Sequence, residues 1–130
     1  MVKKASFALF VLLVCGLMSN CPSGYAESRV YVHFFVVPAA VKSGKNLSEE
    51  LTTLRQKLVS LAGGYTELGP SRGGSKGPNG EIETEDNYSF LVAAPQNITA
   101  ELKKYIPQHF ATEHPFVLVW EAASSFPLGT

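Results

Sequence analysis

Four stretches of the chain carry the apolar pattern of β-strands. Residues 29–38 (RVYVHFFVVP) are almost continuously β-branched or aromatic and end in proline, which predicts a strand. Residues 115–122 (PFVLVWEA) repeat that pattern near the C-terminal end. Between them, residues 65–68 predict a short strand, and residues 82–94 contain a longer one that stops at Pro95.

Two other stretches carry the spacing of helices. Asn46 and Glu49 form a capping box, with Ser48 as an alternative cap one turn later, and Gly63 and Gly64 stop the helix that follows. A second helix is predicted over 98–106, closed by Pro107. The first helix carries its apolar stripe at Leu47, Leu51, Leu54, Leu58 and Leu61.

The order of these elements is β-α-β-β-α-β. With right-handed crossovers, the simplest arrangement is an α+β, ferredoxin-like sandwich. It has a four-stranded antiparallel sheet, both helices on one face, and the first and third strands in the middle. We expect residues 27–123 to form this single domain, followed by a C-terminal tail, 124–130.

The predicted strands are apolar on both faces. On the first strand, Val32 and Phe34 point one way, and His33 and Phe35 point the other. Two helices cover only one face, so the other would leave an apolar patch in water. We therefore expect a homo-oligomer, a dimer or trimer, or a ligand on that face, and we place His33 and Phe35 there.

The first 26 residues have the pattern of a secretory signal peptide. Lys3 and Lys4 precede an apolar run, 7–18, and small residues precede a cleavage site after Ala26. The run is too short to span a bilayer as a helix. We expect a periplasmic or extracellular protein, with lipid anchoring at Cys21 as the less favoured alternative.

Charge and cysteine content narrow the classes of function. Removal of residues 1–26 leaves nine basic and eleven acidic residues, a net charge of −2, which does not suit nucleic-acid binding. Both cysteines lie in that leader, so the domain has no thiol chemistry. No motif for a cofactor or a metal is present, and no serine or cysteine nucleophile lies in a recognisable motif.

Residues 63–87 hold seven of the eleven glycines of the chain. We expect residues 69–81 to form a long loop with a tight turn at 78–80. A strand follows this loop, whereas a nucleotide-binding glycine loop requires a helix there, so this segment is not a nucleotide-binding loop. The loop is either a mobile hairpin connection or a weak site for an anionic ligand through Arg72 and Lys76.

Acidic residues and histidines are the remaining candidates for chemistry. Glu81, Glu83 and Glu85 share one face of an extended strand. We single out Glu85, which could either pair with Arg72 or accept hydrogen bonds from amide groups. His33 is a candidate base or ligand between subunits, or else an interface residue that only forms hydrogen bonds.

The run LRQKLVSLAGGYT, followed by the glycine-rich segment and GEIETEDNYSFLV, resembles a group of small, uncharacterised prokaryotic proteins. The resemblance covers about 51–94. It implies a ferredoxin-like fold that dimerises or trimerises through its sheet. Its motifs, Gly-Gly-x-Thr and Gly-x-Ile-x-x-Glu, fall on Gly63, Gly64, Thr66, Gly80 and Glu85.

Two functions fit these observations. The first is an exported, non-catalytic module that binds a ligand or a partner, with Arg72, Lys76, Glu85, Thr66 and His33 as candidate binding residues. The alternative is a small enzyme that uses Glu85 or His33 as general acid or base. The sequence leaves open whether the protein is an enzyme.

Overall fold

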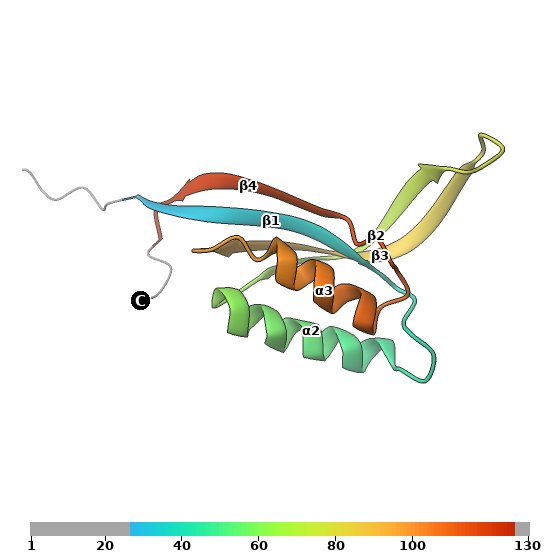
Figure 1. Ribbon diagram of the computed structural model, residues 1–130, viewed down its shortest axis with the longest axis horizontal. Coiled ribbons are helices and arrows are strands. Elements are labelled where there is room, and N and C mark those ends of the chain that lie inside the picture. Colours follow the sequence, from blue (N-terminus) through green and yellow to red (C-terminus); the bar gives the residue numbers. More distant parts are fainter. Residues whose placement is uncertain (1–26, 127–130) are drawn as a thin grey trace, which may run out of the picture.

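A computed structural model describes residues 27–126, and these residues form a two-layer α+β fold (Figure 1). The four strands make one antiparallel sheet in the order β2-β3-β1-β4, and both helices lie on the same face of it. The predicted ferredoxin-like architecture is therefore confirmed, with the first and third strands in the middle. The elements are β1 (Ser28–Pro38), α2 (Leu47–Ala62), β2 (Thr66–Lys76), β3 (Ile82–Ala94), α3 (Thr99–His109) and β4 (Val117–Ser124).

The hydrophobic core lies between the helix layer and the two central strands. Phe35 of β1 stands opposite Phe90 of β3, and their rings stack with centroids 5.3 Å apart. Both rings are fully buried against apolar side chains from α2 and α3. The helix side chains that are almost fully buried in this cluster are Leu51, Leu54, Leu58, Leu102 and Ile106.

Helix α2 begins and ends as its sequence predicts. The Asn46 side chain accepts hydrogen bonds from the backbone N–H groups of Ser48 and Glu49, at 2.9 and 3.3 Å. Gly63 takes the left-handed conformation (φ 80°), and its N–H donates to the Val59 carbonyl at 2.8 Å. These caps fix the length of the helix that covers β3 and β1.

Helix α3 runs past the predicted stop at Pro107 and ends at His109. Proline removes one helical hydrogen bond, but the chain continues because Phe110 is fully buried beyond it. The Phe110 N–H donates to the Ile106 carbonyl at 2.9 Å, and Phe110 also forms a bridge with Val41. Tertiary packing therefore extends the helix by one turn and makes His109 a helical residue.

The glycine-rich segment is not the loop that we expected. Most of it is strand β2, which pairs with β3 as far as Lys76↔Ile82. A register shift between Glu67 and Gly69 marks a β-bulge near the start of β2, a feature that bends strands. The predicted tight turn is present, because the Gly80 N–H donates to the Gly77 carbonyl at 3.0 Å.

The far end of the β2–β3 hairpin projects beyond the body of the fold and bends away from the helices (Figure 1). Strand β1 pairs with β3 only as far as Pro38↔Asn87, with one further hydrogen bond from Ala39 N to Asp86 O at 2.8 Å. Residues 73–85, called the arm below, therefore pair only with each other. Backbone pairing, rather than glycine flexibility, governs this segment.

The two faces of the sheet are assigned differently from our expectation. His33 and Phe35 are fully buried on the face that α2 and α3 cover, so their predicted position on the uncovered face was wrong. The uncovered face, called the open face below, carries the alternate residues. Because both faces of these strands are apolar, the pattern alone could not tell which one meets the helices. The open face includes Val32, Phe34, Val36, Leu91, Phe116, Leu118 and Trp120.

Within residues 27–126, neither helix is long and apolar enough to cross a membrane.

Candidate functional site

A groove of about 470 Å³ lies in the angle between the open face and the arm that rises from it (Figure 1). Its apolar side is formed by Phe34 and Val36 of β1 and by Phe116, which precedes β4. The rings of Phe34 and Phe116 meet edge to face, with centroids 6.4 Å apart. The opposite side of the groove is polar, so a ligand there would meet aromatic surface and hydrogen-bonding groups together. The polar side is made by residues 71–75 of β2 and by Glu83, Glu85, Asn87 and Ser89 of β3.

The alternation of residues along the hairpin creates this polar side. On β2, Ser71, Gly73 and Ser75 pair with Asn87, Glu85 and Glu83 of β3, so all six share one face. The β2 residues are small and leave space, whereas those of β3 carry the carboxylates and the amide. At Gly73 a Cβ atom would lie 3.0 Å from the end of the Asn87 side-chain amide, so a larger residue there would require Asn87 to shift.

Two side chains in the groove are held by hydrogen bonds and are more than nine-tenths buried. The Ser71 and Ser89 hydroxyl groups lie 2.6 Å apart, and Ser89 is buried. In the amide orientation that satisfies its neighbours, buried Asn87 donates to the Asp86 carbonyl and to Glu85 Oε2, each at 3.2 Å. These bonds fix the base of the arm and position the Glu85 carboxylate.

The charge of the groove comes mainly from carboxylates. Arg72 donates to Asp86 at 2.8 Å, and this hydrogen bond raises the pKa of Arg72. Arg72 therefore does not pair with Glu85, because the two side chains lie on opposite faces of the hairpin. Of the two alternatives for Glu85, the structure has the amide hydrogen bond, which comes from Asn87. With Arg72 neutralised by Asp86, the Glu83 and Glu85 carboxylates suit a cationic ligand better than an anionic one.

The structure does not bring all five candidate binding residues together. Arg72 and Glu85 line the groove, whereas Lys76 lies further along the arm and is not part of its lining. Thr66 lines a separate hollow of about 270 Å³, together with the Gly63–Gly64 pair and Phe126.

His33 lies in the core and not in the groove. Its Nε2 atom accepts a hydrogen bond from the Ile98 N–H at 3.1 Å and lies 3.3 Å from Asn97 Oδ1. Within the described part of the chain, Nδ1 has no hydrogen-bond partner. Thr99, the first residue of α3, donates its N–H to Asn97 Oδ1 at 3.0 Å. His33 therefore helps to anchor the start of α3 to the sheet.

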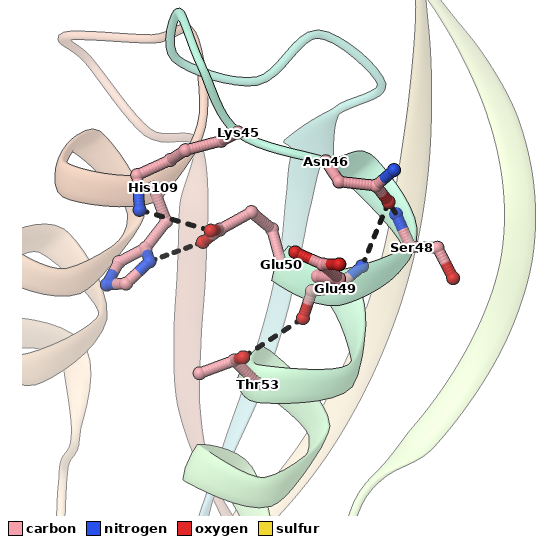
Figure 2. Close-up of polar contacts among 7 residues, drawn as sticks. All are labelled: Lys45, Asn46, Ser48, Glu49, Glu50, Thr53 and His109. Atoms are coloured by element: carbon pink, nitrogen blue, oxygen red, sulfur yellow. Dashed lines mark hydrogen bonds and ion pairs between the residues drawn. The ribbon is translucent and has the colours of Figure 1, made fainter.

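A second polar cluster joins the two helices, and sequence reasoning missed it (Figure 2). Glu50, in the first turn of α2, accepts a hydrogen bond from Lys45 at 3.1 Å and contacts His109 Nδ1 of α3 at 2.5 Å. The His109 ring stacks on Tyr105, with centroids 4.0 Å apart. Neither Glu50 nor His109 lines the groove, and their contacts tie α2 to α3.

Burial and hydrogen bonding act in opposite directions on Glu50. Burial raises the pKa of the Glu50 carboxyl, but hydrogen bonds from Lys45 and His109 and their positive charge outweigh burial and lower the pKa. Burial also raises the pKa of Tyr105, with a smaller contribution from the Glu50 charge. Glu50 is therefore held as a carboxylate between the two helices.

Each missed residue had a signal in the sequence. Glu50 lies three positions after Leu47, on the inward side of α2, and His109 lies three positions after the buried Ile106. In the groove, Ser71, Gly73 and Ser75 occupy every second position, which is the spacing of residues on one face of a strand. This signal can be used only once the segment is known to be extended. Our placing of a loop at 69–81 and a helix end at Pro107 hid both signals.

Among residues 27–126, no group of three or more histidine, cysteine, aspartate or glutamate side chains is arranged to hold a metal ion.

The chain was also compared with known proteins. No protein-family model matches it, and a search of curated proteins finds no significant match.

Proposed function

We propose that this chain is an exported, non-catalytic binding module that acts as a homo-oligomer through its open face and binds a small ligand in the groove. The observation that carries the proposal is the groove itself, which joins an aromatic side to a hydrogen-bonded polar side. Ligand sites in proteins combine such an apolar lining with a few placed polar groups.

The chemistry of the lining favours a small organic cation. Glu83 and Glu85 supply negative charge, and the faces or edges of Phe34 and Phe116 supply apolar contact. An ammonium group gains from carboxylates and from aromatic faces, whereas an anion meets like charge. The positive charge of Arg72 is already paired with Asp86, so the anionic ligand that the sequence suggested has less support.

The alternative of a small enzyme receives no support from His33. The His33 side chain is fully buried, and its Nε2 atom already accepts a hydrogen bond from the Ile98 N–H, so it is poorly placed to exchange a proton with a substrate. Glu85 lines the groove together with Glu83, but His33 does not accompany them there. Binding without catalysis is therefore the function that the arrangement favours.

Benzylamine and benzoate test the proposal, because they share one ring and carry opposite charges. We expect benzylamine, and not benzoate, to shift the backbone amide NMR signals of residues 71–75 and 83–89. Glu85→Gln should weaken the response at least several-fold, whereas Glu113→Gln, an exposed site outside the groove, should leave it unchanged. Equal responses to the two probes, or none, would contradict a cation-binding groove.

The predicted cleavage of the signal peptide is tested separately, by mass spectrometry of the protein recovered from a bacterial host. Cleavage after Ala26 is the expected result. A product that retains residues 1–26, or carries lipid on Cys21, would contradict it.

A further inference from the structure

We infer that the open face is covered by a second copy of this chain, and that the arm of each copy lies against the open face of the other. This inference rests on the proposed sheet-face oligomer and adds what the arm does in it. Each groove would then be completed by residues from both copies. Three features of the described residues support it: the apolar area of the open face, the unsupported arm, and the division between apolar and charged residues.

The apolar area of the open face is large for a surface left in water. Phe116, Leu118 and Trp120 are 51%, 48% and 46% exposed. An aromatic side chain offers about 150–250 Å², so Phe116 and Trp120 together expose roughly 200 Å². A homodimer of standard size buries about 800 Å² per copy, of which roughly 500 Å² is apolar. Two residues thus supply more than a third of that apolar area, and the neighbouring half-buried side chains add to it.

The arm lacks support from its own chain. Residues 73–85 form a two-stranded ribbon, and none of them belongs to the hydrophobic core. Ile82, at its outer end, is 78% exposed. A two-stranded ribbon is only marginally stable in water unless it packs on another surface. Because the arm bends to the side opposite the helices, a copy on the open face would meet its concave side (Figure 1).

The distribution of charge matches an interface between copies. On the open face, the apolar residues that remain partly or largely exposed on β1 and β4 are Val32, Phe34, Val36, Leu118 and Trp120. The carboxylates Glu83 and Glu85 lie on the arm, at the margin of this apolar surface. Homodimer interfaces have this anatomy, with an apolar centre and a polar rim. A two-fold pair brings the same apolar patch together twice and supplies a surface for both arms in one contact.

The first test is the mass of the full chain exported from a bacterial host, measured by analytical ultracentrifugation. We expect a dimer, and Trp120→Glu should convert it to a monomer. Val59→Glu is the matched control, because Val59 is 50% exposed on α2, on the other side of the molecule. A dimer that survives Trp120→Glu, or that Val59→Glu dissociates equally, would overturn the inference.

The second test examines the arm without disturbing the open face. Two differently tagged chains, both with Cys15→Ser and Cys21→Ser, would be coexpressed, one with Ser75→Cys and the other with Leu118→Cys. Ser75 lines the groove on the arm, and Leu118 lies on the open face. A short bismaleimide should link the two cysteines and so join the two differently tagged chains. The control pair, Ser75→Cys with Val59→Cys, should remain unlinked.

The outcomes separate this inference from the proposed function. A dimer with the Ser75–Leu118 link supports both. A dimer without that link, or a trimer, overturns the role of the arm and leaves the sheet-face oligomer standing. A monomer overturns the oligomer and the role of the arm together, while benzylamine binding by that monomer would still support the groove as a ligand site.

Discussion

The two halves of the β2–β3 hairpin have the same backbone pairing but different surroundings. In the near half, Glu67 lies opposite the fully buried Phe90, and α2 covers this part of the sheet. In the far half, Lys76 lies opposite Ile82, and both side chains are exposed. The near half draws its stability from burial, whereas the far half has only its ladder of hydrogen bonds. The comparison shows that strand pairing extends a hairpin further than the core can support it.

The largest expected effect contrasts an apolar residue from each half. Phe90→Ala removes a fully buried ring that stacks on Phe35, and it should lower the free energy of unfolding by about 3–5 kcal/mol. Ile82→Ala, in the arm, should change it by less than about 0.5 kcal/mol in the monomer. Urea unfolding followed by circular dichroism measures both. Similar losses at the two positions would show that the arm is packed within the single chain.

A second prediction concerns β1, the strand that supports the near half. His33→Leu leaves the Ile98 N–H without its acceptor, which should cost about 1–3 kcal/mol of unfolding free energy. The exposed His114 provides the control, because His114→Leu removes an imidazole without removing a buried hydrogen bond. Equal unfolding midpoints for His33→Leu and the parent chain would contradict the anchoring role of His33.

The helix layer beneath the near half should respond to acid through Glu50. The pKa of Glu50 is lowered in the folded protein, so its contribution is fully present above the pKa of the unfolded chain. It is lost as the pH falls through the lower, folded pKa. Glu50→Gln should therefore be less stable by about 1–3 kcal/mol at neutral pH, and the difference should shrink in acid.

Denaturant unfolding at a series of pH values between neutral and strongly acidic measures this difference. Glu113→Gln, at an exposed position, is the control and should track the parent chain throughout. A gap between Glu50→Gln and the parent that widens in acid would have the wrong sign and would contradict the cluster drawn in Figure 2.

The smallest effects are expected when one ion pair in each half of the hairpin is removed. Arg55 bonds both carboxylate oxygens of Glu67, at 2.8 and 3.0 Å, and that pair is partly buried. Arg72 makes a single bond to Asp86 in an exposed pair. Arg55→Gln should lower the Tm measurably, by an amount that corresponds to about 1 kcal/mol or less, and Arg72→Gln should leave it unchanged. A larger loss for Arg72→Gln would mean that the arm base is more constrained than its exposure indicates.

The elements with strong local signals were predictable. The stripe of leucines, the Asn46 cap and Gly63 located α2, and the apolar runs located β1 and β3. In contrast, β2 was predicted to end at Leu68, because glycine and serine have low strand propensity. Its pairing with β3 overrides that propensity. The end of α3 was missed for a similar reason, since the packing of Phe110 outweighs the effect of Pro107.

The candidate site was predicted only in part. Arg72 and Glu85 do line the groove, but Phe34, Phe116 and Ser89 come from elements far apart in the sequence. No local pattern could bring them together, because the groove depends on the bend of the hairpin and on the pairing of β4 with β1. Glu50 and His109 were missed because 59 residues separate them in the chain.

The sequence by itself determined the order of the elements, the stripe that α2 buries, and therefore the ferredoxin-like architecture. These follow from periodicity and capping, which act over a few residues. Only the tertiary structure decided which of two apolar faces the helices cover, that the glycine-rich segment is an extended arm, and which polar residues meet. Those outcomes depend on contacts between distant segments, whose energies no local pattern contains.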